Sequence, residues 1–332
     1  MEYRNLGRAG LKVTAVGLGT HYFGWFQDEA TSIAVVNRAL DLGVNFFDTA
    51  DAYDKGRSEE FLGKAIKGRR SELVVATKFA VPLGGGPSGA PIDQRPNFRG
   101  GSRSYVLNAV EASLRRLNTD YIDLYQVHLP DPHTPIEETL RALDDLIRSG
   151  KVRYIGCSNF SAWQTAEAMW TSKYHDLNAF VTTQSLYNLL QREIEQELVP
   201  CCDTHGLGII PWGPLAGGFL SGKYRPGQPY PADSLLATKP IAYQHVTTET
   251  NWARLAGFEK FAAARGKTVG ELAIAWLLAQ PHVCSVIPGV SRPEQFEVHV
   301  KAAEWRLDAA ELAEIDRIHA GGMDPPARYS IR

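Results

Sequence analysis

The chain has 332 residues, a formal net charge of −2, 44% hydrophobic residues and 22% charged residues. This balance is ordinary for a globular protein and excludes disordered and fibrous classes. Lys and Arg form no long run, so neither nucleic acid nor a membrane surface is an expected partner. No long apolar stretch or signal-peptide pattern is present, which predicts a cytoplasmic protein. The four cysteines lack disulfide-framework spacing, so we expect reduced thiols.

Short apolar runs rich in Val, Ile, Phe and Tyr alternate along the chain with longer segments of helical period. A helix after each strand lets consecutive strands lie parallel, and eight such units are typical of a (β/α)8 TIM barrel, an α/β fold of one domain over 1–332. A doubly wound sheet with a second domain is the alternative. The expected strands lie near 14–19, 45–49, 73–78, 121–128, 152–157, 180–185, 208–212 and 284–288.

Local signals refine this outline. Residues 4–14 read as an N-terminal β-hairpin ahead of the first strand. The connections 79–101 and 216–250 are too long for plain linkers, and since both follow strands, we expect them on the C-terminal, catalytic face. Capping boxes are expected at Thr134 with Glu137, Ser161 with Gln164, Thr268 with Glu271, and Ser291 with Glu294.

Four polar residues stand at or beside the ends of consecutive predicted strands. Asp48 and Tyr53 follow the second strand, Lys78 ends the third and His128 ends the fourth. Each alone is more typical of a solvated strand terminus than of a catalytic site. Because the C-terminal strand ends of a barrel converge on one mouth, we expect the four side chains to lie together.

Such a group favours proton donation to an oxyanion. A tyrosine titrates near pH 10, and a cation in contact with it lowers that pKa, so we expect Lys78 to make Tyr53 a better acid. Asp48 is the available anion that keeps a buried Lys78 charged. His128 then fits as a hydrogen-bond donor to a carbonyl oxygen.

Six motifs carry a family resemblance: NFFDTADAY, LVVATK, LYQVH, GCSNF, PWGPLAGGFLSGKY and VIPGVSRPEQ. In this order and spacing they resemble the aldo-keto reductase superfamily over nearly the whole chain. PWGPLAGGFLSGKY is similar to the branch that includes potassium-channel beta subunits and many bacterial reductases. The resemblance implies a (β/α)8 barrel that binds NADPH and passes a hydride from the nicotinamide to an aldehyde or ketone. It also implies a tetrad in which Tyr53 is the general acid, beside Asp48, Lys78 and His128.

The same resemblance implies a set of cofactor contacts. Ser158, Asn159 and Gln184 match positions that bond the nicotinamide carboxamide, and Trp212 matches the aromatic that stacks on the ring. A segment with Lys223 matches the one that wraps the pyrophosphate; no Rossmann glycine fingerprint is present. The full predicted set is Gly19, Thr20, Ser158, Asn159, Gln184, Trp212, Gly213, Pro214, Leu215, Gly217, Lys223, Gly289, Ser291, Arg292, Gln295 and His299.

The adenine end departs from the family pattern. Ser291 and Arg292 start a helix, where amide groups and a guanidinium favour the 2′-phosphate of NADP. After Gln295 the family usually has an acid followed by asparagine, and this chain has Val298 and His299. The strictness of NADP over NAD therefore stays open.

The substrate is expected to be a small-molecule carbonyl compound of unidentified structure. Tyr22, Trp25 and Phe26 follow the first strand and form either a substrate wall or core packing. No metal site is expected from His128 and His133, which lack further ligands. Trp163, Met169 and Trp170 are interpreted as helix packing residues.

Two alternatives stay open for the function. The tetrad serves alcohol oxidation as well as carbonyl reduction, so the physiological direction is undetermined. A cofactor-occupied, redox-sensing interaction subunit is the other alternative, against which His128 argues, since channel-associated relatives commonly lack it. A single sequence reveals no interface, so the oligomeric state is also open.

Overall fold

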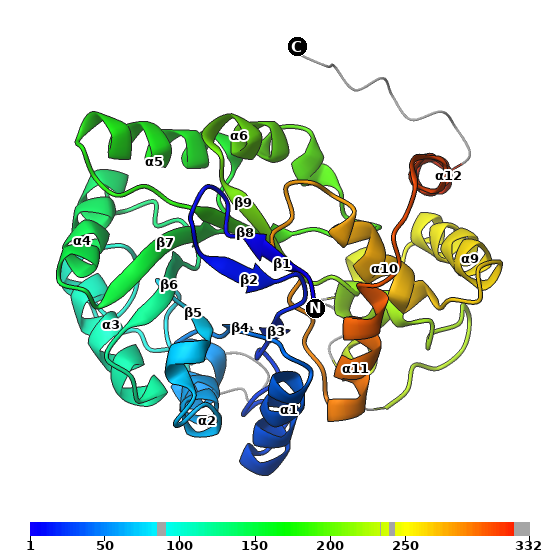
Figure 1. Cartoon of the computed structure of the whole chain (residues 1–332), viewed down its shortest axis with the longest axis horizontal. Coiled ribbons are helices and arrows are strands. Elements are labelled where there is room, and N and C mark those ends of the chain that lie inside the picture. The colour runs from blue at the N-terminus through cyan, green and yellow to red at the C-terminus, as the bar shows by residue number, and fades with distance from the viewer. Residues whose placement is uncertain (85–90, 233, 239–242, 322–332) are drawn as a thin grey trace.

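The computed structural model describes residues 1–84, 91–232, 234–238 and 243–321. Its centre is a curled sheet whose strands follow chain order from β3 to β9 (Figure 1). Every neighbouring pair is parallel, as the alternation of strands and helices requires. The strands are β3 (Leu18–Gly19), β4 (Phe46–Asp48), β5 (Val74–Phe79), β6 (Ile122–Val127), β7 (Val152–Ser158), β8 (Thr182–Leu186) and β9 (Gly208–Trp212).

The segment predicted as an eighth strand, 284–288, does not form a strand. This part of the chain makes one isolated parallel bridge to each side, Val283 to Ile209 and Val286 to Val16. Each bridge is a single rung to a different neighbour, so the consecutive ladder that defines a strand is missing. The segment therefore lies between β3 and β9 and bridges both edges of the seven-stranded sheet.

Helices surround the outer face of the sheet (Figure 1). Each of β4 to β9 is followed by helical structure before the chain continues. The helices are α1 (Glu29–Asp41), α2 (Arg57–Ala65), α3 (Arg103–Leu117), α4 (Ile136–Arg148), α5 (Ala162–Tyr174), α6 (Leu198–His205), α7 (Leu235–Thr238), α9 (Glu249–Ala263), α10 (Val269–Leu278), α11 (Pro293–Ala302) and α12 (Ala309–His319). Of the α5 residues interpreted as helix packing, Met169 is buried, whereas Trp163 and Trp170 are 66% and 58% exposed.

Helix starts follow the predicted capping only in part. The capping box predicted at Thr134 is wrong, because the N-cap residue of α4 is Pro135 and Thr134 precedes it. The Thr134 hydroxyl instead donates to Asp131 Oδ2 at 2.7 Å. The boxes predicted at α5 and α10 are confirmed, with Ser161 and Gln164 in the first and Thr268 and Glu271 in the second.

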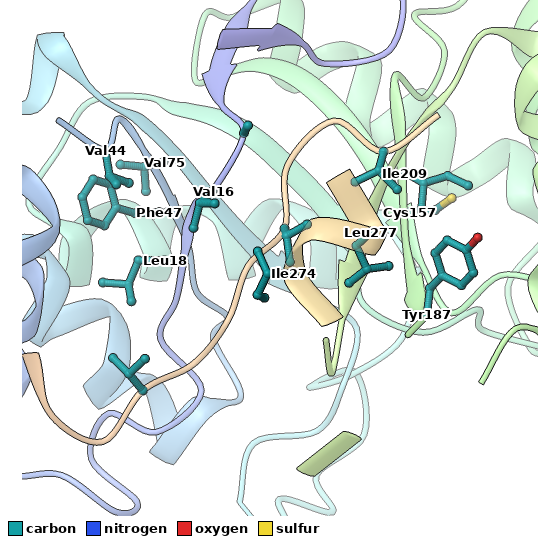
Figure 2. Close-up of a cluster of buried hydrophobic side chains, with 14 of the residues drawn as sticks. Val16, Leu18, Val44, Phe47, Val75, Cys157, Tyr187, Ile209, Ile274 and Leu277 are labelled. Atoms are coloured by element: carbon teal, nitrogen blue, oxygen red, sulfur yellow. The ribbon is translucent and has the colours of Figure 1, made fainter. Parts of the chain in front are cut away.

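A large apolar cluster fills the space between the sheet and the helices. Figure 2 shows outward-facing Phe47, Val75 and Ile209 of three strands together with Ile274 and Leu277 of α10. Each such fully buried aliphatic or aromatic side chain contributes roughly 1.5–3 kcal/mol of transfer free energy. This packing fixes the strands whose ends carry the polar residues.

A second, smaller cluster lies inside the sheet and includes the N-terminal hairpin. β1 (Tyr3–Asn5) pairs antiparallel with β2 (Lys12–Thr14). Thr14, predicted as the first residue of the strand 14–19, therefore belongs to the hairpin, and the strand of the main sheet begins at Leu18. Hairpin residues pack against Phe46 and Val74, the first residues of β4 and β5, so the hairpin covers the N-terminal end of the strands. The cluster contains Leu6, Ala9, Val13, Phe46, Val74, Ala76, Leu124, Ile210, Cys284 and Ile287.

The two long connections differ from each other. Of the connection 79–101, residues 85–90 lie outside the described part of the chain. The connection 216–250 begins with the 3-10 segment η4 (Ala216–Ser221) and also contains α7, so it is partly helical; its residues 233 and 239–242 are not described. All four cysteines are free thiols, as predicted.

Candidate active site

The candidate site lies where the inward face of the sheet changes from apolar to polar. Side chains two residues apart in a strand share a face. Three inner-cluster residues, Phe46, Ala76 and Leu124, are each followed two residues later by a buried polar side chain. Since β4, β5 and β6 are adjacent, these polar side chains converge; they are Asp48, Lys78 and Gln126.

Lys78 connects the predicted acid and the predicted phenol. Its Nζ lies 2.5 Å from Asp48 Oδ1 and 3.3 Å from the Tyr53 hydroxyl, and it donates at 2.9 Å to the carbonyl of Thr49. These three bonds use all three donors of the ammonium group. The side chains of Lys78 and Asp48 are 0% and 2% exposed, so solvent ions do not screen the pair.

Two amides complete the surroundings of Asp48. Its Oδ2 accepts hydrogen bonds from Gln126 Nε2 at 3.1 Å and Gln184 Nε2 at 2.9 Å. Gln126 was not among the predicted residues, although its position two residues before His128 on the same strand face marked it. Gln184, predicted as a nicotinamide contact, orients Asp48 here.

Burial sets the protonation of the phenol and the amine. Burial raises the pKa of Tyr53, and the opposing effect of Lys78 does not reverse the change. The expectation that Lys78 brings this pKa down is therefore wrong in net direction, because a buried phenolate loses more hydration than one ammonium replaces. For Lys78, burial lowers the pKa, but Asp48 and Tyr53 together raise it above its ordinary value, so the amine stays protonated.

His128 lies beside Tyr53 after the end of β6. The two ring centroids are 5.8 Å apart in an edge-on arrangement. Burial above all, and then the charges of Lys78 and His21, hold the pKa of His128 well below its ordinary value. Its Nδ1 has no hydrogen-bond partner among the described residues. A neutral imidazole carries a single N–H, which suits one hydrogen bond to an oxygen atom.

The loop that carries Tyr53 has a left-handed backbone. In the 3-10 segment η1 (Tyr53–Gly56), Asp54 and Lys55 have φ angles of 46° and 58°. Such a conformation costs an L-residue roughly 1–2 kcal/mol and persists where neighbouring contacts hold it. Arg57 supplies one such contact, 3.0 Å from Asp54 Oδ2.

Aromatic rings after β3 stand against Tyr53. The ring centroids of His21 and Trp25 are 4.9 and 5.8 Å from that of Tyr53. The structure thus brings the predicted substrate residue Trp25 to the phenol. It also places His21 there, which follows the same predicted strand and belongs to the same run of residues as Trp25.

Two tyrosine rings lie on glycines of the predicted cofactor segments. A Cβ on Gly289 would come within 2.9 Å of the Tyr22 ring, and one on Gly217 would collide with the Tyr243 ring. Tyr22, predicted as a substrate residue, therefore lies beside a glycine predicted to bind the cofactor, and its ring centroid is 5.3 Å from that of Phe26. Phe26 is 39% exposed. Glycine at both positions lets the tyrosine ring lie directly against the backbone.

The predicted nicotinamide contacts form a connected set at the ends of β7 and β9. Asn159 Nδ2 donates to Ser158 Oγ and to the carbonyl of His128, both at 3.0 Å, and Trp212 Nε1 donates to Asn159 Oδ1 at 2.9 Å. The Trp212 side chain is nevertheless 38% exposed. An oriented, uncovered indole beside side-chain amides fits a flat heteroaromatic ring bearing a carboxamide.

The remaining cofactor candidates differ in exposure. The Thr20 hydroxyl is fully buried, 2.7 Å from Ser58 Oγ, and donates to the carbonyl of Asp48 at 3.1 Å, so it braces the strand end. Lys223 is exposed, with Nζ 5.1 Å from the Tyr224 ring centroid. Gly19 and Pro214 are buried, whereas Gly213 and Leu215 are half-buried.

The start of α11 differs from the prediction. The helix begins after Arg292, so the third helical residue is Gln295 and the box predicted with Glu294 is wrong. Gln295 Oε1 accepts from the amides of Ser291 and Arg292 at 2.9 and 3.2 Å. Both residues remain exposed at the surface.

The two atypical residues of α11 have opposite environments. Val298 is 46% exposed, whereas His299 is 8% exposed. Burial lowers the pKa of His299 to about 4, so its imidazole is neutral. Its Nδ1 has no partner within the described chain.

A second buried acidic group lies behind the site. Arg116 Nε is 2.6 Å from Glu59 Oε2, and Thr77 donates to Glu59 Oε1 at 2.5 Å. Asp51, two residues before Tyr53, accepts from the Tyr105 hydroxyl at 3.4 Å. Burial, reinforced by Glu59, raises the pKa of Asp51 well above its ordinary value. This cluster ties the Tyr53 loop to α2 and α3.

The described ranges lack both metal-binding clusters and membrane-spanning helices. They hold no group of three or more His, Cys, Asp or Glu side chains placed to bind a metal. His133, considered with His128 in the sequence, is exposed, and its amide donates to Asp131 Oδ1 at 2.9 Å. No helix within those ranges has the length and apolar character to cross a bilayer.

Comparison with known proteins gives one consistent result. The Aldo/keto reductase family matches residues 15–320. A probable voltage-gated potassium channel subunit beta of Arabidopsis thaliana is 38% identical over 92% of each chain. The aldo-keto reductase YhdN of Bacillus subtilis is 36% identical, covering 98% of this chain and 96% of that one. L-glyceraldehyde 3-phosphate reductase of Escherichia coli is 34% identical, covering 97% and 93%.

These matches span almost the whole chain and include several reductases. The residues that carry the site geometry lie within the matched range. The chain therefore belongs to the aldo/keto reductase family and is an oxidoreductase.

Proposed function

We propose that this protein reduces an aldehyde or ketone to the alcohol with NADPH as the hydride donor. The observation that carries the proposal is the Lys78 ammonium, 2.5 Å from Asp48 and 3.3 Å from the Tyr53 hydroxyl. A phenol in contact with a fixed cation gives up its proton at lower cost than an isolated buried phenol. Residues 1–332 act in this proposal as one domain, with 284–288 closing the sheet as the eighth element of a barrel.

NADPH, when bound, supplies the hydride that forms the new C–H bond at the carbonyl carbon. As the carbonyl π electrons move to oxygen, the Tyr53 O–H bond breaks and its proton passes to that oxygen. Lys78, held by Asp48, stabilises the resulting phenolate, which takes a proton back from solvent. His128 donates its single N–H to the same oxygen and orients it. Trp25 limits the approach of the substrate.

The geometry beyond the strand ends supports the following cofactor contacts. Ser158, Asn159 and Trp212 would hold the nicotinamide, and Lys223 the pyrophosphate. Arg292 is an exposed guanidinium at a helix start, which favours a 2′-phosphate and hence NADP over NAD.

The decisive variant is Tyr53→Phe, tested by NADPH oxidation with a panel of aldehydes and ketones. It removes the proton donor and keeps the ring, so turnover should fall roughly 10²–10⁴-fold, while NADPH affinity, measured by fluorescence titration, stays within about twofold. Tyr121→Phe, at the N-terminal end of β6, is the matched control and should retain turnover. Turnover of Tyr53→Phe equal to that of the unaltered protein would refute the proposal.

A second candidate is a cofactor-occupied subunit of a larger assembly, favoured by the similarity to proteins named as potassium channel beta subunits. The two candidates differ in turnover. A reductase oxidises many equivalents of NADPH with a good carbonyl substrate, whereas a sensing subunit oxidises little beyond its bound cofactor. Supplying alcohols with NADP⁺ tests the oxidation direction on the same site.

A further inference from the structure

The turn that carries Tyr53 ends against a guanidinium group. Gly56 closes the η1 turn with a φ angle of 91°, and the side chain of Arg116, on α3, lies directly on it. A Cβ at Gly56 would come within 2.4 Å of Arg116 Nε and 2.5 Å of Arg116 Cδ. Glycine therefore lets Arg116 lie this close to the backbone. The place of Arg116 sets where the Tyr53 turn ends.

Arg116 is itself held by Glu59 of α2. Its Nε lies 2.6 Å from Glu59 Oε2. Glu59 is 0% exposed, and its other oxygen accepts from the Thr77 hydroxyl at 2.5 Å. Thr77 stands in β5 immediately before Lys78. The contacts of Arg116 thus reach the strand residue whose ammonium group meets the Tyr53 hydroxyl.

These contacts close a ring around the pair formed by the phenol and the ammonium group. The ring runs from Lys78 Nζ to the Tyr53 hydroxyl at 3.3 Å, along the turn to Gly56, and back through Arg116, Glu59 and Thr77. Because a closed ring has no free end, the distance between Tyr53 and Lys78 depends on each of its contacts. Arg116 supplies two of them from a helix behind the site.

The guanidinium group also balances buried charge. Two carboxyl groups that interact with it, Glu59 and Asp51, are 0% and 2% exposed. Burial lowers the pKa of Arg116, but Glu59 and Asp51 together raise it above its ordinary value, so the side chain stays charged. Without Arg116, Glu59 would be a buried carboxylate lacking its cation, which is relieved by entry of water or by protonation. Both changes disturb the contacts that hold the turn.

We propose that Arg116 is a positioning residue for the reaction and holds the Tyr53 hydroxyl in reach of Lys78. The inference rests on the proposed function, in which Tyr53 is the acid. Arg116 lies outside the predicted cofactor and substrate residues, so its effect on turnover passes through the turn. A displacement of about 1 Å at a catalytic group can lower turnover roughly 100-fold. A purely structural ion pair would lower the melting temperature and leave the turnover of folded protein unaltered.

The first test replaces Arg116 by alanine and follows NADPH oxidation with the carbonyl compound that the unaltered protein reduces fastest. We expect kcat to fall roughly 10–100-fold, while the NADPH dissociation constant from fluorescence titration stays within about twofold. Arg116→Lys keeps the charge without the planar fork and should lose less. Arg115→Ala is the matched control and should retain kcat, since Arg115 is exposed and forms no ion pair within the described ranges.

Added guanidinium gives a rescue that a loss of stability would not show. A surface cavity of about 530 Å³ is lined by Arg116 together with Gly63, Lys67 and Arg115, so the alanine variant opens a path from solvent to Glu59. Guanidinium chloride, far below the concentrations that unfold proteins, should restore part of the lost kcat. Sodium chloride at the same concentration should not, because it lacks planar hydrogen-bond donors.

Carbon-13 NMR of protein labelled at the tyrosine Cζ reports on the phenol without substrate or cofactor. The Tyr53 resonance is the one that disappears in Tyr53→Phe. It should shift in Arg116→Ala, since the contact with Lys78 changes, and return with guanidinium, and it should not move in Arg115→Ala. If the unaltered protein reduces no carbonyl compound, the proposed function fails, and a shift of this resonance would still support Arg116 as the residue that positions Tyr53.

The double variant Arg116→Ala with Glu59→Gln covers the case in which the single variant does not fold. It leaves no uncompensated carboxylate, and the glutamine can still accept from Thr77. This protein should melt close to the unaltered protein and still lose turnover. The inference is overturned by turnover of either alanine variant within about twofold of the unaltered protein, by a Tyr53 resonance that does not move, or by a guanidinium rescue no larger than that of sodium chloride.

Discussion

Replacing Lys78 by methionine separates the structural and chemical roles of the buried ion pair. Methionine keeps the apolar length of the side chain and removes the charge. Asp48, 2% exposed, would then keep only the two amide donors of Gln126 and Gln184. Removing one partner of a buried pair typically costs about 3–5 kcal/mol, because the other charge is left uncompensated. With an unfolding entropy of about 2.1 cal/mol/K per residue, that loss lowers the Tm of this 332-residue chain by about 4–7 °C.

The double variant Lys78→Met with Asp48→Asn restores stability but not chemistry. It removes both charges, and the new amide oxygen still accepts from Gln126 or Gln184. Replacing a whole buried pair by neutral groups is often close to neutral for stability, so we expect most of the lost Tm to return. Turnover should stay low in both variants, since Tyr53 lacks its cation.

Scanning calorimetry and NADPH oxidation on the same samples provide the readouts. An unchanged Tm for Lys78→Met would show that the pair contributes no net stability. Recovery of turnover in the double variant would refute the role assigned to Lys78. Lys64→Met is a control for loss of an exposed lysine, because its pair with Glu29 is exposed on both sides and contributes little.

Three further predictions concern groups around the site. The raised pKa of Asp51 means that folding favours its protonated form, so this stabilisation is complete below about pH 4 and is lost as pH rises; Asp51→Asn should gain Tm over the unaltered protein at pH 7.5 but not near pH 4. The depressed pKa of His128 keeps its ring neutral, so the pH profile of kcat/KM should show no inflection near 6.5. Trp212→Ala should weaken NADPH binding in fluorescence titrations by roughly tenfold, and Trp212→Phe by less, because the ring remains.

The order of strands and helices could be predicted because buried apolar residues recur in the sequence with the pattern of each element. Runs such as 73–78 are apolar on both faces, as strands covered inside and outside must be, and β5 forms there. The segment 284–288 is also buried, and yet this part of the chain makes only single bridges. Composition reports that a segment is buried, but the register with both neighbours decides whether a ladder forms.

The sequence predicted site residues mainly where they stand at or beside the end of a strand. Asp48, Lys78 and His128 were predicted to lie together because each stands at or beside the end of its strand. Gln126 lies two residues before His128 along the strand. Its role depends on Asp48 Oδ2, the carboxylate oxygen that Lys78 does not contact. The direction of the Tyr53 pKa was missed because it depends on burial depth, which local sequence does not state.

In the proposed reaction, the hydrogen bonds of the group favour Tyr53 as the proton donor over its other members. Lys78 directs its three donors at Asp48, Thr49 and Tyr53, so none is left for a substrate. His128 is neutral, and giving up its single proton would leave an imidazolate, far less accessible than a phenolate. Since Lys78 donates to the Tyr53 oxygen, the phenolic hydrogen is free to point towards the mouth. A substrate oxygen bound there meets one acidic hydrogen and one neutral donor, which is the arrangement that protonates an alkoxide only as it forms.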